Sequence, residues 1–286
     1  MKKTADSLFE DQATIKSSAH SKIVVELNQD HPGFRDAEYR ERRNKIAQIA
    51  YEHQPGTPVP DAPYTEDENK LWNSIIGLLK PVHQQWACQE FLEYWDKLQL
   101  PEHRIPQLQE VSAKMNRLGG FSFAPACGLA LPRDFLMSLG SRVMLATQYI
   151  RHYSKPDYTP EPDVVHELVG HGAMLVAPEF VFLNELFGRV AAKVDDATIE
   201  KIIRLYWWSV EFGVVKEKGH TKAVGAGLLS SFGELQSMPA RPLRTFDPKV
   251  MEMTDFDPTT IQPFYFCAAH SQELISGLNV HLHSYL

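Results

Sequence analysis

One stretch of the chain combines residue types that bind transition metals. Residues 159–172 read TPEPDVVHELVGHG and place His166 and His171 five positions apart. Imidazole nitrogens are common ligands of iron, zinc and copper. Residues five apart lie about 140° apart around an ideal α-helix, so both can face one ion only if the helix ends or is distorted between them. We expect Gly170 and Gly172 to supply that break, which would place His166 inside the helix. His171 would then lie on the turn that leaves it.

A carboxylate elsewhere in the chain completes a ligand set. Glu211 lies in the almost wholly apolar segment YWWSVEFGVV, and a lone buried carboxylate is costly unless it is paired or bound to a cation. Two histidines and one carboxylate form the facial triad that holds Fe(II) and leaves sites open for water, O₂ or substrate. Asp163 and Glu167 could fix the histidine tautomers.

Other interpretations of these residues remain open. The same three ligands could hold a catalytic zinc ion in a hydrolase, with Glu167 as the general base. The histidines could instead be hydrogen-bonded core residues, and Glu211 could form an ion pair with an arginine. A structural zinc site is less suited, because it requires four protein ligands.

Helical spacing predicts most of the elements that must position these residues. We expect a mainly α fold with a few short β-strands, in which Thr65 and Glu68 form a capping box and Gly119 ends a helix. Four prolines between residues 55 and 63 predict an extended loop. The expected helices lie at 37–54, in two or three segments between 65 and 100, at 105–118, from Pro132 and at 198–215, with short strands and a last helix after residue 246.

Composition narrows the class of protein. The chain has 286 residues, 43% of them hydrophobic, so it can bury a core, and its net charge of −7 argues against binding of nucleic acid. We found no apolar run long enough to cross a membrane and no secretory signal. Cys88, Cys127 and Cys267 are too few and too widely spaced for a disulfide framework, so we expect buried thiols and a cytoplasmic location. The arginines at 40, 42 and 43 are most simply a solvated helix face.

Five blocks of sequence resemble the pterin-dependent aromatic amino acid hydroxylases, and most closely the bacterial phenylalanine 4-hydroxylases. The combination of YIRH, TPEPD..HEL.GH and YW..VEFG is highly specific to that family. The blocks are HPGFRDAEYRERR (31–43), CGLALPRDFL (127–136), TQYIRHYSKPDYTPEPDVVHELVGH (147–171), IEKIIRLYWWSVEFG (199–213) and AVGAGLLSSFGELQ (223–236). The resemblance implies a single catalytic domain over residues 29–286. Residues 1–28 are polar and weakly patterned, which predicts a flexible tail.

The resemblance implies an assignment for each site residue. It implies Fe(II) on His166, His171 and Glu211, which with Glu167 form the catalytic group, and a tetrahydropterin cosubstrate beside the metal. The pterin would contact Gly128, Leu129, Ala130, Phe135, Glu167 and Tyr206. The amino acid would be held by Arg151, Thr159, Pro160, Trp207 and Ser230. The implied reaction uses O₂ and passes through a ferryl species to convert L-phenylalanine into L-tyrosine.

Some positions depart from the pattern of animal members. Animal enzymes carry serines where this chain has Ala130, Leu131 and Pro132, and a histidine where it has Leu145. We expect no regulatory domain and no tetramer of the animal type, but a monomer or small homo-oligomer. Tryptophan and tyrosine remain alternative substrates. Tyrosine hydroxylases place an aspartate near Pro258, although Asp257 adjoins it here.

Overall fold

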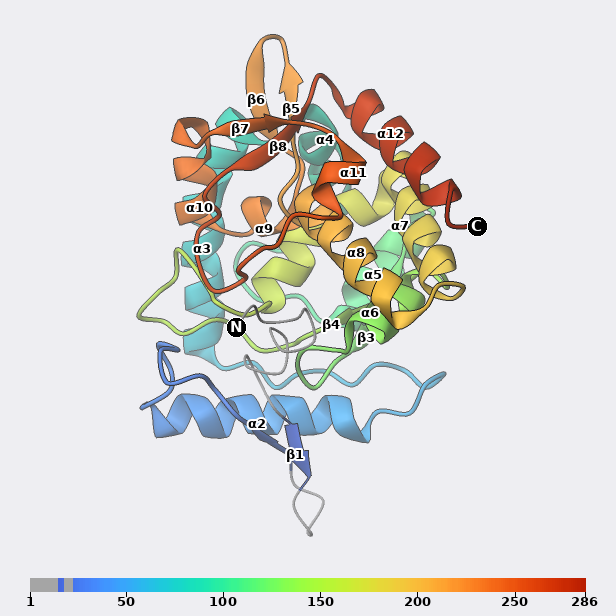
Figure 1. The fold of residues 1–286 in the computed structure, drawn as a ribbon. Helices are drawn as coiled ribbons and strands as arrows, with labels where there is room; N and C mark the ends of the chain where they lie inside the picture. The colour runs from blue at the N-terminus through green and yellow to red at the C-terminus, as the bar shows by residue number, and fades with distance from the viewer. Residues whose placement is uncertain (1–14, 18–22) are drawn as a thin grey trace.

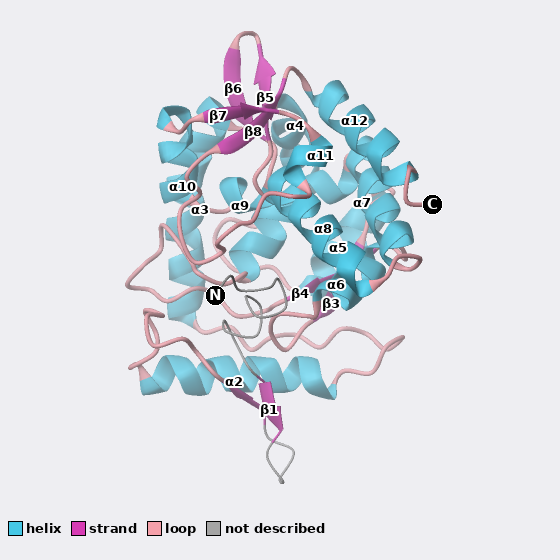
Figure 2. Ribbon diagram, in the orientation of Figure 1, coloured by secondary structure: helices cyan, strands magenta, loops and turns pink. Residues whose placement is uncertain are grey.

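The computed structural model describes residues 15–17 and 23–286, and helices dominate it (Figures 1 and 2). The mainly α class with a few short strands is confirmed. The α-helices are α2 (Ala37–Glu52), α3 (Glu66–Trp86), α4 (Gln89–Leu98), α5 (Leu108–Arg117), α6 (Pro132–Leu139), α7 (Pro178–Ala191), α8 (Asp196–Tyr206), α9 (Ala226–Leu229), α10 (Phe232–Ser237), α11 (Pro248–Met251) and α12 (Ser271–His283). Shorter helical turns are η1 (His166–His171), η2 (Met174–Val176), η3 (Trp207–Glu211) and η4 (Met238–Ala240).

The strands are short and form three small sheets. They are β1 (Ile15–Ser17), β2 (Ile23–Val25), β3 (Ser122–Pro125), β4 (Val143–Ala146), β5 (Val214–Glu217), β6 (His220–Ala223), β7 (Leu243–Thr245) and β8 (Tyr265–Ala268). The largest sheet has the order β6-β5-β8-β7, with β5 antiparallel to β6 and parallel to β8. Lys218 and Gly219 join β5 to β6, both with positive φ, as a tight hairpin turn requires.

Local signals in the sequence set several helix ends. The Thr65 side chain accepts from the backbone N–H of Glu68, whose carboxylate accepts from the Thr65 N–H, so the capping box is confirmed. Helix α6 begins at Pro132, and α5 ends at Arg117, two residues before Gly119 with its φ of +80°. These ends required no tertiary information, because each is set by residues within a few positions: a capping box, a proline at the first helical position and a glycine with positive φ.

Helix α2 lies along one end of the molecule and the four-stranded sheet at the opposite end (Figure 1). The expectation that the α2 arginines are solvated is wrong for Arg43. Its side chain is 2% exposed, bonds the Glu161 carboxylate at 2.8 Å and stacks over the Tyr149 ring at 3.3 Å. Burial is tolerated because the charge is paired, and the pair fastens α2 to the segment that leads into the histidines.

The expected tail at residues 1–28 falls mostly outside the described residues. Within it, β1 pairs with β2, and Val25 and Leu27 pack with Ala47 of α2. The boundary at residue 28 therefore stays a prediction. Among the described residues, no helix is both long and apolar enough to traverse a lipid bilayer. The three cysteines are free thiols, and only Cys88 is fully buried.

Candidate active site

Both histidines lie on a single π-helical turn. Residues 164–165 are α-helical, and η1 continues from His166 to His171. In a π-helix each N–H bonds the carbonyl five residues earlier, so side chains five apart become neighbours on one face. The helix is distorted between the histidines, which is one of the two possibilities that the spacing allowed, but the expectation that His171 lies on a turn leaving the helix is wrong. The helix widens instead of ending.

The glycines of this segment allow close packing rather than a break. A Cβ on Gly170 would lie 2.6 Å from the carbonyl oxygen of Ala226 in α9. Glycine at this position thus lets η1 approach the α9 backbone, and the approach brings Ser230, the residue after α9, next to His166. The sequence analysis singled out Gly170, but expected it to break the helix rather than to allow this close approach.

Glu211 is the last residue of a second π-helical turn, η3, which continues α8. The helix expected to run to residue 215 ends here, because Phe212 leaves helical geometry and Val214 begins β5. The side chain of Glu211 is buried with no arginine or lysine beside it among the described residues. Its partners are the two imidazoles, so the ion-pair alternative raised by the sequence is wrong.

The three side chains point at one position. The Nε2 atoms of His166 and His171 are 3.0 Å apart, and the Glu211 carboxylate oxygens lie 3.5 Å from the first and 3.1 Å from the second. Two ligands at right angles and about 2.1 Å from one ion would be about 3.0 Å apart. The three donor atoms all lie within 4.8 Å of one another, so the set fits a single divalent cation.

Ser230 fixes the tautomer of His166. Its hydroxyl donates to the carbonyl of Ala226 at 2.8 Å, so towards His166 Nδ1, at 3.1 Å, it acts as an acceptor. His166 then carries its proton on Nδ1 and turns the lone pair of Nε2 towards the other two ligands. Neither Asp163 nor Glu167 makes this contact. Asp163 instead accepts from the backbone N–H of His166 at 3.0 Å.

Burial sets the protonation of the ligand atoms. It lowers the pKa of His166 to about 4, which favours the neutral, metal-binding imidazole. Burial would raise the pKa of Glu211, but the facing imidazole of His171 outweighs it and holds the pKa below its usual value. The carboxylate in turn raises the pKa of His171 against the effect of burial. A cation that displaces the proton shared by His171 and Glu211 would therefore meet one anionic and two imidazole donors, as a facial triad requires.

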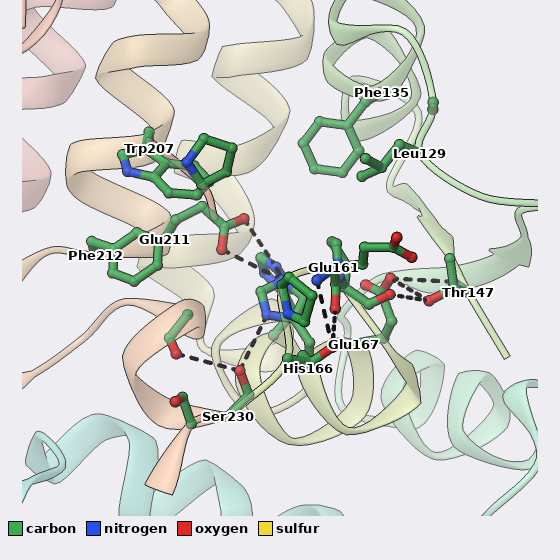
Figure 3. Close-up of a pocket in the computed structure, with 18 of the residues that line it drawn as sticks. Leu129, Phe135, Thr147, Glu161, His166, Glu167, Trp207, Glu211, Phe212 and Ser230 are labelled. Carbon is green, nitrogen blue, oxygen red and sulfur yellow. Dashed lines mark hydrogen bonds and ion pairs between the residues drawn. The ribbon is translucent and has the colours of Figure 1, made fainter. Parts of the chain in front are cut away.

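The cluster forms part of the wall of a pocket that contains every site residue singled out from the sequence. Figure 3 shows Phe135 and Leu129 on one side of the histidines, and Trp207 and Phe212 on the other. The sequence-derived residues in its wall are Gly128, Leu129, Ala130, Phe135, Arg151, Thr159, Pro160, His166, Glu167, His171, Tyr206, Trp207, Glu211 and Ser230. Residues that are more than 100 positions apart thus converge on one cavity.

Arg151 is held so that one edge of its guanidinium stays available. Asp163 accepts from Nε at 2.9 Å and from Nη2 at 2.8 Å, and the carbonyl of Pro156 accepts from Nη1 at 3.4 Å. A guanidinium has five N–H groups, so two remain along the edge formed by Nη1 and Nη2. That edge can receive a carboxylate in the bidentate geometry that arginine favours.

Elsewhere in the pocket wall, Glu167 and Tyr206 are positioned by buried hydrogen bonds. The Glu167 carboxylate accepts from the N–H and hydroxyl of Thr147 at 3.1 and 3.2 Å, and burial raises its pKa to about 8. The Tyr206 hydroxyl points to Asn184 at 3.2 Å, and its ring packs edge-on against Phe135 with centroids 5.5 Å apart. Tyr206 therefore offers the pocket its ring rather than its hydroxyl.

Other residues of the pocket gave no signal in the sequence. Thr147, Tyr158, Glu234 and Thr260 line it, but lie outside any recognisable ligand spacing. The hydroxyl of Thr159, expected at the substrate, donates to the carbonyl of Glu161 within its own turn at 2.9 Å. Trp208 is a core residue, stacked on Phe264 with ring centroids 4.8 Å apart.

Known proteins resemble this chain over most of its length. Residues 12–284 match the family described as biopterin-dependent aromatic amino acid hydroxylase. Tyrosine 3-monooxygenase from Bos taurus is 43% identical over 252 residues, which cover 86% of this chain and 51% of that protein. Phenylalanine-4-hydroxylase from Caenorhabditis elegans is 43% identical over 250 residues, covering 85% and 55%. The chain thus spans about half the length of the curated relatives it matches.

The fold leads to the same family. Phenylalanine hydroxylase from Chromobacterium violaceum, with bound iron(III) and the oxidised cofactor 7,8-dihydrobiopterin, has a TM-score of 0.74 and 26% identity. The match covers 82% of this chain and 88% of that one. With the sequence match over residues 12–284 and a site whose donor set suits iron, this chain belongs to the family of biopterin-dependent aromatic amino acid hydroxylases.

Proposed function

We propose that this chain is a mononuclear iron monooxygenase that hydroxylates L-phenylalanine to L-tyrosine, with O₂ and a tetrahydropterin as cosubstrates. The observation that carries the proposal is the convergence of His166, His171 and Glu211 inside an aromatic pocket, with no arginine or lysine paired with the carboxylate among the described residues. The three residues would hold Fe(II). Three ligands on one face leave room on the ion for oxygen and water.

When bound, the iron and the reduced pterin supply the activation of O₂ and its transfer to the aromatic ring. The residues of the chain bind and orient the amino acid. The free edge of Arg151 takes its carboxylate, while Trp207, Phe212 and Pro160 enclose its ring and exclude water. Thr159 lines the pocket, with its hydroxyl bonded to the carbonyl of Glu161 in the same turn. Ser230 also lines the pocket and accepts the Nδ1 proton of His166.

The pterin would occupy the side of the pocket opposite Trp207. Gly128 to Ala130 and Phe135 form an apolar wall there, and a flat heterocycle can stack on the Phe135 ring. The carboxyl of Glu167, anchored by Thr147, is the polar group that faces this side together with the ring of Tyr206. Ala130 offers no hydroxyl to the pterin, unlike the serines of animal members.

Phenylalanine is the substrate that the pocket supports best, with tyrosine and tryptophan as the alternatives. Asp257, which adjoins the position where tyrosine hydroxylases carry an aspartate, uses its carboxylate within its own turn, accepting from the N–H and hydroxyl of Thr259 at 2.9 and 2.6 Å. Pro258 lines the pocket and offers no polar group for a substrate hydroxyl. An unsubstituted ring needs none.

The remaining expectations are part of the same proposal. The zinc hydrolase alternative has no support from the family match. A cytoplasmic location agrees with three free thiols, and we propose a monomer or small homo-oligomer with no nucleic-acid or membrane partner. The product would serve either the supply of tyrosine or the breakdown of phenylalanine.

The test is reconstitution from defined components. Purified chain, Fe(II), tetrahydrobiopterin, O₂ and phenylalanine together are expected to yield tyrosine, and omission of any one should abolish it. Tyrosine and tryptophan are assayed in parallel, and zinc replaces iron as a metal control. Phenylalaninamide, which lacks the carboxylate that Arg151 would bind, should be a much poorer substrate. No tyrosine from the complete mixture would defeat the proposal.

A further inference from the structure

An irregular loop between α11 and β8 forms part of the pocket wall beside Trp207. Pro258 and Thr260 line the pocket from this loop, although the residues next to them in the chain are exposed. A loop without regular backbone pairing depends on side chains to define its shape. The side chain that defines this one is Gln262, which is buried but does not line the pocket itself.

The carboxamide of Gln262 uses each of its polar atoms. Its Nε2 donates to the carbonyls of Asp257 and Thr260, at 2.9 and 2.8 Å. Its Oε1 accepts from the indole Nε1 of Trp207 at 3.3 Å. The orientation of the amide follows from this pattern, because only an N–H₂ group can satisfy two carbonyls and only an oxygen can accept from an indole.

The backbone of Gln262 is also held by a buried hydrogen bond. Its backbone N–H donates to Glu234 Oε1 at 2.8 Å, and the same oxygen accepts from the Tyr265 hydroxyl at 3.1 Å. Glu234 belongs to α10 and Tyr265 to β8, so Gln262 is fixed to two elements that do not belong to the loop. Buried polar networks in which every member is satisfied hold one arrangement.

Trp207 is positioned by the loop side as much as by its own helix. Its ring stacks on Phe256 with centroids 4.2 Å apart and an interplanar angle of 10°, and it lies tilted against Phe212 at 4.6 Å. These aromatic contacts let the ring slide in its plane. The hydrogen bond to Gln262 is directional and therefore fixes the position of the indole within that plane.

We propose that Gln262 is a specificity-determining positioning residue, which sets the width of the ring pocket by holding Trp207 and the 257–260 loop at a fixed separation. The inference rests on the proposed function, because it takes the space beside Trp207 as the site of the substrate ring. A wall fixed in this way admits a phenyl ring and resists the larger indole. If Trp207 and the loop can move apart, the pocket discriminates less between phenylalanine and tryptophan and holds the substrate ring less firmly.

Two variants of Gln262 test this with different chemistry. Gln262→Glu keeps the shape but replaces the double donor with an oxygen that faces two carbonyls, and Gln262→Met keeps the length but makes no hydrogen bond. Both should lower the preference for phenylalanine over tryptophan, measured as the ratio of kcat/KM values, by about tenfold. Less product per pterin oxidised is expected as well. Gln109→Glu, at an exposed position of α5, is the matched control and should change neither quantity.

The readouts separate positioning from mere stability. A residue that only stabilised the fold would lower turnover with every amino acid alike and leave the ratio unchanged, and that result would overturn the proposal. Failure of both variants to fold would overturn it as well. If the wild-type chain makes no tyrosine, the proposed function fails, but the ratio is still read on the aromatic amino acids that it hydroxylates. The two failures are therefore distinct.

Discussion

Two buried carboxylates lie at the same pocket and differ in what balances their charge. Asp163 is fully buried and closed by Arg151, with bonds of 2.8 and 2.9 Å. Glu211 is nearly as buried but faces only the imidazoles of His166 and His171. The Asp163 cluster is complete as folded, whereas the Glu211 cluster has its donors arranged for a cation. Burial alone thus does not distinguish a structural carboxylate from a metal ligand; the partner does.

Removal of the Glu211 carboxylate should have the largest effect on turnover. In Glu211→Ala we expect loss of bound iron and a fall in activity of at least about a thousandfold, beyond the ten- to hundredfold that loss of an outer-shell partner costs. The chain should remain folded, because the variant removes a carboxylate whose burial is costly, and the two imidazoles left behind can stay neutral. Metal content and tyrosine formation measure the effect.

Thermal unfolding tests the role of Glu211 in iron binding without an activity assay. Anaerobic Fe(II) should raise the melting temperature of the wild type and of Glu102→Ala, an exposed control, but not that of Glu211→Ala. Equal iron content in wild type and Glu211→Ala would remove Glu211 from the ligand set.

Neutralisation of Asp163 should instead damage the fold. Asp163→Asn leaves the Arg151 guanidinium buried without a counter-charge, and loss of one partner of a buried pair costs about 3–5 kcal/mol. Denaturant unfolding at pH 7 measures this free energy. The control is Asp196→Asn, which breaks an exposed pair with Arg133 and should cost no more than about 1 kcal/mol. Similar losses in the two variants would contradict the distinction drawn between the carboxylates.

A third carboxyl, Glu234, extends the comparison, because neither a salt bridge nor an imidazole pairs with it among the described residues, although the charge of Arg241 lowers its pKa slightly. Burial raises its pKa from 4.5 to about 7, although hydrogen bonds from Gln262 and Tyr265 oppose the rise. Between pH 4.5 and pH 7 the folded chain retains a proton that the unfolded chain releases. The free energy of unfolding therefore falls as pH rises through this window, by at most about 3 kcal/mol.

Glu234→Gln removes that titration and keeps an oxygen that can accept from Gln262 and Tyr265. The stability of the variant relative to wild type should thus increase by up to about 3 kcal/mol from pH 4 to pH 8, with most of the change below pH 7. Urea unfolding across this range measures it, with Glu102→Gln as the exposed control. Parallel pH curves for wild type and Glu234→Gln would show that folding does not change the pKa of Glu234.

The sequence anticipated which residues meet at the pocket better than how the backbone brings them there. The histidine pair, the isolated Glu211 and the blocks of family resemblance named residues that do line one cavity. The same reasoning placed a helix break where the chain forms a π-helical turn, and it extended a helix into β5. Propensity does not distinguish an α-turn from a π-turn. The extra residue is accommodated because neighbouring elements such as α9 pack against it.

The order of amino acids specifies the chemical groups of the site: two imidazoles and a carboxylate in apolar surroundings, an arginine and aromatic side chains, and helix ends set by nearby caps and glycines. The packing of the folded chain sets the pairing of Asp163 with Arg151, the burial of Arg43, and the role of Gln262 between Trp207 and its loop. The reason is physical. Caps and side-chain types act within a few residues, whereas the partner of a buried polar group is whichever complementary atom the packed chain brings within about 3 Å.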